Sequence, residues 1–335
     1  MKLGTPRWWY VKNGGAAPLT RALLTPLSWI WADATRRRIA RTTPAIVGAP
    51  VICVGNVTMG GAGKTPIVRE LLLTLTRRGV NAHGLSRGYG GKLKGPTQVD
   101  TRRHTAKDVG DEPLMLAQDF PMWVAIDRVA GAKAAATRGA QAIVMDDGHQ
   151  NPSIKKALSL VVVDGETRGG EWPFGDGRVF PAGPMREPLK VGLSRADAVI
   201  VLLPVDMEQP DFDLLVEFGD MPVLVARLEP AAPVPAGPQV GFAGIGKPWK
   251  VEKALTAAGC QLVDFAPFPD HGEYDEATLK MLADRARVYD AGLVTTEKDW
   301  VRLPPAWRDK VMPWPVRARF DDEAAVEELL AKVGL

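Results

Sequence analysis

The chain has 335 residues, of which 46% are hydrophobic and 24% are charged, and its formal net charge is +3. These are the values of an ordinary globular protein, so a disordered chain, a collagen and a disulfide scaffold are excluded. The length favours two domains. The two cysteines, Cys53 and Cys260, lie far apart in the chain, which is typical of a reduced, cytoplasmic protein and offers no zinc site.

The first 45 residues concentrate positive charge. Eight basic residues stand there against one acid, Asp33, so this segment is +7 and the other 290 residues sum to −4. Four of the ten tryptophans lie in it: Trp8, Trp9, Trp29 and Trp31. This composition suits a membrane interface, and the alternative is a basic helix whose tryptophans pack on the domain. Nucleic acid is not an expected partner, because the rest of the chain is acidic and has no recognition motif.

From residue 50 onward, short β-branched runs alternate with helical stretches. Strands are predicted at 51–54, 80–85, 142–145, 158–163 and 198–203, and helices at 65–78, 111–118 and 129–138. Strands that are apolar without alternation, separated by helices, indicate an α/β fold with a parallel sheet covered on both faces.

A proline-rich stretch, 230–238, interrupts this pattern. Beyond it, strands are predicted at 240–243, 261–265 and 293–295, and helices at 250–258 and 275–289. We therefore expect two domains, residues 1–225 and residues 226–335, of which the second is a smaller α/β unit. The sequence leaves open whether the last twenty residues, 316–335, return to the first domain.

Residues 58–65, Thr-Met-Gly-Gly-Ala-Gly-Lys-Thr, form the strongest local motif. They follow a predicted buried strand and begin a helix, which is the context of a phosphate-binding loop. The glycines let backbone N–H groups approach phosphate oxygens, and the helix N-terminus adds positive potential. Lys64 would reach the β- and γ-phosphates, and the Thr65 hydroxyl would bind Mg²⁺. The loop is thus predicted to hold a nucleotide through Thr58, Met59, Gly60, Gly61, Ala62, Gly63, Lys64 and Thr65. Thr58 departs from the general motif, which has glycine there.

Asp146 and Asp147 directly follow the predicted strand 142–145. A carboxylate at a strand end beside a phosphate loop is placed to hold Mg²⁺, directly or through water. The two adjacent side chains point in different directions, so metal binding and a supporting role could be divided between them. The alternative is a polar turn, and His149 nearby is predicted to be structural.

Further motifs narrow the function of the phosphate loop. They are Trp8-Trp-Tyr10, Gly55-Asn56, Ser86-Arg-Gly-Tyr-Gly90, Val109-Gly-Asp-Glu-Pro113, Asp146-Asp-Gly-His-Gln150, Pro181-Ala-Gly-Pro-Met-Arg-Glu-Pro188, Gly241-Phe-Ala-Gly-Ile-Gly246, Pro269-Asp-His271 and Thr295-Thr-Glu-Lys-Asp299. In this order, over nearly the whole chain, they resemble the tetraacyldisaccharide 4′-kinases of lipid A biosynthesis. That family also carries Thr at the place of Thr58. The chain departs from it at His149, where an aromatic residue is usual, and at Gly272.

The resemblance implies a P-loop NTPase-like kinase that uses ATP and Mg²⁺. It would phosphorylate the 4′-hydroxyl of a tetraacyldisaccharide 1-phosphate and so form lipid IVA. The resemblance also implies a peripheral protein on the cytoplasmic face of the inner membrane of a Gram-negative bacterium. Its expected partners are the lipid disaccharide 1-phosphate and an anionic membrane surface, and no protein partner is implied.

The resemblance also assigns a catalytic pair. A sugar hydroxyl needs a proton acceptor, and Asp111 in the GDEP motif is similar to the family's catalytic aspartate. It would act with His271, which orients it or takes the proton onward. Because His271 lies in the second domain, we expect the site in the cleft between domains. Without the resemblance, Asp111 reads as a helix cap and His271 as a loop histidine.

Four more residues are candidates: Arg87, Glu112, Arg186 and Glu187. Arg87 follows a predicted strand, where it could contact a phosphate or form a salt bridge, and the other three match motif positions. Residues 297–299 are expected to form a solvated or salt-bridged turn, with a contact to the substrate domain as the alternative.

Two rival classes are a P-loop GTPase or metallochaperone and a non-catalytic membrane module. The first needs a guanine-reading NKxD segment or a Cys/His cluster, and two isolated cysteines and four histidines offer neither. The second would not explain the phosphate loop, the strand-end aspartates and the GDEP motif together.

Overall fold

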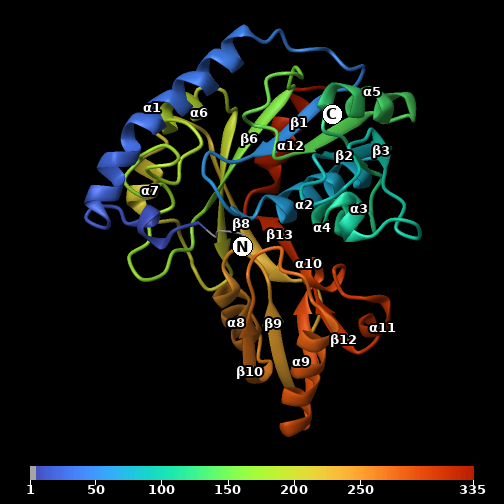
Figure 1. Ribbon diagram of the computed structural model, residues 1–335. Helices are drawn as coiled ribbons and strands as arrows, with labels where there is room; N and C mark the ends of the chain where they lie inside the picture. The colour runs from blue at the N-terminus through green and yellow to red at the C-terminus, as the bar shows by residue number, and fades with distance from the viewer. Residues whose placement is uncertain (1–4) are drawn as a thin grey trace.

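A computed structural model describes residues 5–335 of the chain. Two sheets organise this part: nine strands in the order β13-β8-β7-β6-β1-β5-β2-β4-β3, and four in the order β10-β9-β11-β12. Figure 1 shows the larger sheet and its helices in the upper half of the view and the smaller unit below it. The observed fold confirms the predicted mixed α/β architecture.

The larger sheet is parallel except at its edges, where β3 and β13 run antiparallel to their neighbours. Its strands are β1 (Val51–Gly55), β2 (Ala82–Ser86), β3 (Thr97–Gln98), β4 (Met122–Val124), β5 (Ala142–Asp146), β6 (Leu158–Asp164), β7 (Ala198–Pro204), β8 (Val223–Pro230) and β13 (Val316–Phe320). The central strands β1 and β5 are buried along their whole length, as expected for a sheet with helices on both faces.

Helices cover both faces of this sheet. One face packs on α2 (Lys64–Arg77), α4 (Asp111–Leu116) and α12 (Glu323–Ala331), and the other on α5 (Arg128–Thr137), α6 (Leu189–Leu193) and α7 (Phe212–Val216). In α2 the buried residues Ile67, Leu71 and Leu75 repeat every four positions, which places them on one side of the helix. The short α3 (Ala106–Val109) precedes α4.

The smaller unit is a fully parallel sheet with its own apolar core. Its strands are β9 (Pro238–Ala243), β10 (Gln261–Pro267), β11 (Gly292–Thr296) and β12 (Val311–Trp314), and its helices are α8 (Pro248–Ala257), α9 (Glu276–Val288), α10 (Glu297–Trp300) and α11 (Pro305–Arg308). Phe242, Leu279 and Trp307 contribute to its buried core. Residues 297–299, expected as a turn, lie in the short helix α10.

The chain passes between the two sheets twice. It leaves the larger sheet after β8, and it returns through Pro315 to β13, which pairs antiparallel with β8 from Val316 opposite Pro230. Thus β8 and the segment 316–331 belong to the larger unit, although β8 extends beyond the expected boundary at residue 225 and the segment 316–331 lies entirely beyond it. We retain the division into residues 1–225 and 226–335 as a proposal, with the terminal segment returning to the first unit.

The N-terminal segment lies along the outside of the larger unit (Figure 1). It forms the short 3₁₀ helix η1 (Arg7–Tyr10) and the long helix α1 (Pro18–Arg41). The polarity of α1 is inverted, because Arg21 and Ser28 are buried against the protein while Leu19 and Leu23 are 81% and 79% exposed. Within residues 5–335, no helix is long and apolar enough to cross a membrane.

Candidate active site

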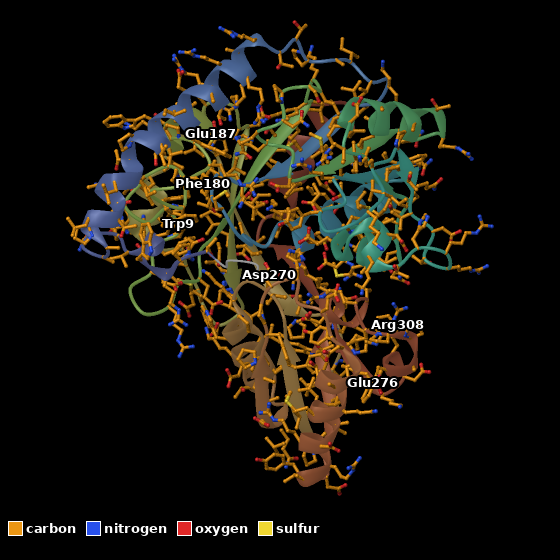
Figure 2. The ribbon with its side chains drawn as sticks, in the orientation of Figure 1. Trp9, Phe180, Glu187, Asp270, Glu276 and Arg308 are labelled. Carbon is orange, nitrogen blue, oxygen red and sulfur yellow. The ribbon has the colours of Figure 1, made fainter. Side chains whose placement is uncertain are left out.

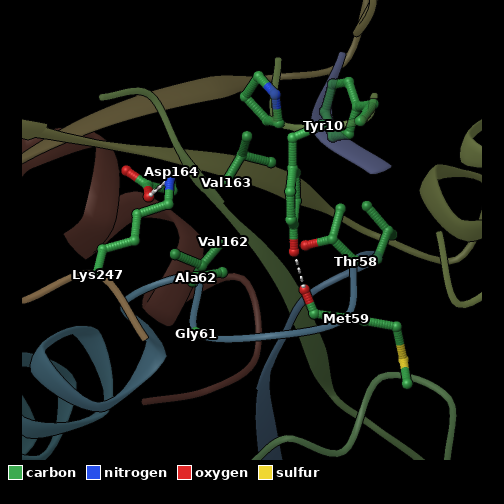
Figure 3. A pocket seen from close by; sticks show the side chains of 12 residues that line it. Tyr10, Thr58, Met59, Gly61, Ala62, Val162, Val163, Asp164 and Lys247 are labelled. Carbon is green, nitrogen blue, oxygen red and sulfur yellow. Dashed lines mark hydrogen bonds and ion pairs between the residues drawn. The ribbon is translucent and has the colours of Figure 1, made fainter. Parts of the chain in front are cut away.

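The glycine-rich loop, residues 58–65, lies at the carboxyl end of β1 and leads into α2. Gly63 precedes the helix with a φ of 76°, and a Cβ there would come within 2.2 Å of the Leu202 side chain, so only glycine fits. The Tyr10 hydroxyl donates a hydrogen bond to the Met59 carbonyl at 3.0 Å (Figure 3). The loop is therefore held in place by the N-terminal segment as well as by its own helix.

Asn56, which is completely buried, braces the loop from below. Its Nδ2 donates to the Thr58 carbonyl at 2.9 Å, and its Oδ1 accepts from Lys64 Nζ at 3.3 Å. The 181–188 motif braces the loop from the side, since Arg186 Nε donates to the same Thr58 carbonyl at 2.9 Å. These contacts fix the lysine ammonium group at the N-terminus of α2.

Asp147 forms the centre of a charged cluster beside Lys64. Both of its carboxylate oxygens accept from Arg186, at 2.6 and 3.1 Å, and Lys64 Nζ lies 3.6 Å away. Partial desolvation would raise the pKa of Asp147, but Lys64 and Arg186 outweigh it and lower the pKa to about 2. Asp147 is therefore firmly ionised and already paired.

Asp146 differs from its neighbour in almost every respect. It ends β5, only 2% of its surface is exposed, and its Oδ1 has no hydrogen-bond partner in the described part of the chain. Burial raises its pKa strongly, and the charge of Glu112 adds to this effect. A buried carboxylate oxygen without a partner, beside the glycine-rich loop, is available to bind a donor or a cation.

Asp111 and His271 come from different units and meet where the two units are in contact. Asp111 begins α4, and its Oδ2 lies 2.8 Å from Nδ1 of His271, which follows β10 with a φ of 55°. A backbone group also binds the Asp111 carboxylate, because the Glu112 N–H donates a hydrogen bond to its Oδ1 at 2.9 Å. Burial alone would raise the pKa of Asp111, but His271, Lys298 and Arg302 lower it to about 2.

Charges of the smaller unit surround this pair. Lys298 Nζ donates to Glu112 at 3.0 Å and lies 3.6 Å from Asp270, which Figure 2 shows at the junction of the two units. Glu297 on the same short helix accepts two hydrogen bonds from Arg69 of α2, at 2.6 and 3.0 Å. Glu297 and Lys298 thus form ion pairs with the larger unit, as the expectation of a salt-bridged segment required.

A small cavity lies between the glycine-rich loop, Tyr10 and the end of β6, with Lys247 of the smaller unit at its edge (Figure 3). Gly61, Ala62 and Asp164 line it, and Lys247 reaches into it to pair with Asp164 at 2.9 Å. A Cβ on Gly246 would lie 3.9 Å from the Gly61 backbone nitrogen. The segment between β9 and α8 therefore lies over the glycine-rich loop.

The remaining predicted residues take different places. Arg87 is exposed after β2 and forms no ion pair within residues 5–335. Glu187 is 2% exposed, pairs with Arg195 at 2.6 Å and accepts from Gln150 at 3.1 Å. It therefore lies beneath the cluster and supports Arg186 through Gln150, whose Oε1 accepts from Arg186 at 3.2 Å. His149 is buried and bonded to the Gly192 carbonyl at 2.8 Å, as its structural prediction required.

Sequence reasoning missed three residues of this site. Asn56 was noted only as part of a motif, although a polar residue directly after a buried strand is a usable signal. Arg128, 4% exposed at the start of α5, has its pKa lowered to about 10 by burial and by nearby Arg87. Arg302 lies 3.8 Å from Asp111, and no local pattern marks it.

Comparisons with known proteins agree with this geometry. The family described as Tetraacyldisaccharide-1-P 4′-kinase matches residues 20–334. The tetraacyldisaccharide 4′-kinases of Caulobacter vibrioides and Phenylobacterium zucineum are similar to the chain. The first is 88% identical over 335 residues, all of both chains, and the second 67% identical over 330 residues, 98% and 99% of the two.

A solved structure shares the fold. It is a crystal structure of an "apo" form of LpxK from Aquifex aeolicus in complex with ATP, with a TM-score of 0.72 and 23% identity, and the match covers 94% of this chain and 99% of that one. Full-length similarity to curated relatives, together with the family match, decides the classification. The chain belongs to the tetraacyldisaccharide 4′-kinase family.

Proposed function

We propose that the protein transfers the γ-phosphate of ATP to the 4′-hydroxyl of a tetraacyldisaccharide 1-phosphate and so forms lipid IVA. The observation that carries this proposal is the convergence of three features in one cleft. The glycine-rich loop supplies phosphate-binding amides, the unpartnered Asp146 oxygen lies beside it, and Asp111 of the same unit meets His271 of the smaller unit. Membership of the kinase family supports the substrate and the reaction.

The order of strands supports an orientation for the nucleotide. In the larger sheet β1 lies between β5 and β6, and ligands of open parallel sheets bind at the carboxyl ends of such central strands. Asp146 ends β5, whereas Asp164 ends β6 on the other side of the loop. We therefore assign the transferring phosphate to the β5 side, where Asp111 also lies, and the nucleoside to the β6 side.

The donors present fit Mg²⁺. Magnesium is usually held by one or two protein oxygens, water and substrate phosphates, so it needs no cage of several side chains. Asp146 Oδ1 is buried without a partner, and Thr65 contributes a hydroxyl at the start of α2. Asp147 would have to leave Arg186 to bind the metal, so we assign it the support of Lys64 and Arg186. When bound, the ion would neutralise charge on the phosphates.

The Asp111–His271 pair would handle the proton of the acceptor hydroxyl. The carboxylate keeps free lone pairs beside its bonds to His271 and the Glu112 N–H, so a sugar hydroxyl can still donate to it. We assign Asp111 as the proton acceptor and His271 as the group that orients it. Arg87, exposed and close to Arg128, is assigned to a phosphate of the lipid.

The inverted helix α1 supports a peripheral position on a membrane. Leu19, Leu23 and Leu27 are exposed together with Trp29 and Ile30, whereas Trp9 packs edge-on against Phe180 at 5.9 Å (Figure 2). Trp29 is thus available to a membrane interface, whereas Trp9 packs on the domain. Exposed apolar residues on a basic helix favour an interfacial location. We propose the cytoplasmic face of the inner membrane, where the acyl chains of the substrate remain in the bilayer.

Transfer of label from γ-labelled ATP to the disaccharide 1-phosphate in detergent micelles tests this function. We expect labelled lipid only with ATP and Mg²⁺, and far less with GTP. Equal use of GTP would favour the rival GTPase class, and binding of lipid without any transfer would favour the non-catalytic module.

A further inference from the structure

Arg302 occupies an unusual position behind the Asp111–His271 pair. It follows α10, and only 8% of its side-chain surface is exposed. Its guanidinium donates to the Gly272 carbonyl at 3.0 Å and to the Gly244 carbonyl at 2.8 Å, and it pairs with Asp299. One side chain thus connects the loop that carries His271 with the loop that lies over the phosphate-binding segment.

The remaining nitrogen of Arg302 points across the cleft. Its Nε is buried and has no hydrogen-bond partner among residues 5–335, and it lies 3.8 Å from Asp111 Oδ2. This is the same oxygen that contacts His271. A buried donor without a hydrogen-bond partner costs free energy, so its place in a native structure calls for an explanation.

The buried charge of Asp299 explains only part of the orientation of Arg302. Asp299 is completely buried, but it already accepts from the Tyr274 hydroxyl at 2.7 Å, the Gly244 N–H at 3.0 Å and the Thr296 hydroxyl at 2.6 Å. These three donors are neutral, so Arg302 supplies the cation that balances the buried charge of Asp299, and it does so through Nη2. That pairing leaves Nε unused, so it does not account for the placement of Nε beside Asp111.

We propose that Arg302 is a positioning residue for the kinase reaction, acting on the Asp111–His271 pair. Its bond to Gly272 fixes the loop of His271, and its charge holds the Asp111 carboxylate with Oδ2 toward His271 Nδ1. This inference rests on the proposed function, and it adds a residue that touches neither the nucleotide nor the acceptor.

Two variants distinguish the positive charge of Arg302 from its hydrogen bonds to the Gly244 and Gly272 carbonyls. Arg302→Met removes both, and we expect kcat to fall by about 10²-fold, because small misplacements of reacting groups have effects of that order. The KM for ATP should change by less than about threefold, since the phosphate loop is untouched. Arg302→Lys keeps the charge but cannot reach both carbonyls, so it should recover part of the loss and remain about tenfold below the wild type.

A matched control lies on the same unit. Arg285 on α9 pairs with Asp264 at 2.6 Å, away from the cleft, and Arg285→Met should leave kcat within about twofold. The folded fraction of every variant should be measured by thermal unfolding. Should Arg302→Met fail to fold, Arg302→Lys carries the test with the same measurements.

A double-variant cycle with His271→Ala then distinguishes positioning from general stabilisation. If Arg302 acts through the pair, adding Arg302→Met or Arg302→Lys to His271→Ala should reduce kcat by less than about threefold more. Multiplicative losses would overturn the proposal, and so would a wild-type kcat in a folded Arg302→Met protein. A wild-type enzyme that transfers no phosphate would instead overturn the proposed function itself.

Discussion

Lys64 and Thr65 are the residues on which the phosphate-loop assignment can be tested most directly. We expect Lys64→Ala and Thr65→Ala to lower kcat by roughly 10²-fold or more, because each removes charge stabilisation from the transferring group. Without Lys64, Asn56 keeps its bond to Thr58 and Asp147 keeps its pairing with Arg186, so the fold should remain intact. Phosphate transfer from γ-labelled ATP measures the effect, with exposed Lys332→Ala as control. Full activity in either variant would show that the loop has another task.

The Asp111–His271 contact predicts coupled effects of substitution. Asp111→Ala and His271→Ala should each lower kcat by roughly 10²–10⁴-fold while changing the KM for ATP much less. Because the two groups form one hydrogen-bonded pair, the double variant should lose far less than the product of the two single losses. Steady-state kinetics of the three variants supply the comparison. Independent, multiplicative losses would mean that the two residues do separate things.

Asp111 also gives a prediction on pH and stability. Its pKa is lowered to about 2 in the folded protein, whereas an unfolded aspartate titrates near about 3.9. Its contribution to stability is therefore fully present above about pH 4 and is lost as the pH falls toward about 2. In Asp111→Asn the free energy of unfolding should decrease less between about pH 5 and pH 3 than in the wild type. Urea unfolding followed by tryptophan fluorescence tests this, with exposed Asp309→Asn as control; parallel curves for all three proteins would contradict it.

At the scale of residues, the sequence predicted individual site residues better than the contacts between them. The glycine loop and the strand-end aspartates are local patterns, so they can be located without a structure. Asp111 and His271 are 160 positions apart and were linked only through the family resemblance. Arg302 could not be found at all, because its role depends on three loops that meet only after folding.

Among the elements, α1 carries the clearest test of the membrane proposal. Arg36, Arg37 and Arg41 are exposed, whereas Arg38 contacts the Gln150 carbonyl at 3.3 Å, so reversing the first three to Glu leaves that contact in place. Each basic residue near an anionic surface is worth roughly 1 kcal/mol, and salt screens this attraction. We expect the triple variant to bind anionic vesicles much more weakly than the wild type.

The control for this prediction changes the same net charge elsewhere. Exposed Arg287, Lys310 and Lys332 of the C-terminal part can be reversed to Glu together. Co-sedimentation with anionic and neutral vesicles compares the three proteins, and raised salt should weaken but not abolish binding by the wild type, because Leu23 and Trp29 remain exposed. Equal sedimentation of both triple variants would end the anchor hypothesis.

The predicted elements show where periodicity is informative. The buried strands β1, β5, β6 and β7 and the helices α2 and α9 were located within a few residues, because their apolar runs are long and distinct. In contrast, β4 has only three residues, and β8 alternates between buried and half-buried positions beside a proline-rich stretch. Such strands are defined by their neighbours in the sheet, which a local pattern does not contain.

For the whole molecule, the pairing of β8 with β13 has a consequence for its architecture. Pro230 and Val316 are direct partners in an antiparallel ladder, so the smaller unit occupies the place of a hairpin turn. The smaller unit is therefore inserted between two paired strands of the larger sheet, and we propose that the larger unit can fold without it. An excised protein in which a two-residue Asn-Gly turn replaces residues 231–315 should therefore fold cooperatively.

This excised protein would separate nucleotide binding from catalysis. It keeps the phosphate loop and Asp146 but lacks His271, so we expect it to bind ATP weakly and to transfer no phosphate. Circular dichroism measures folding, and calorimetric titration measures ATP binding. Aggregation or loss of all helical signal would show that the larger unit depends on the smaller one. If it folds and binds ATP without transferring phosphate, the larger unit is a self-sufficient nucleotide-binding domain, and catalysis depends on the small domain inserted between two of its strands.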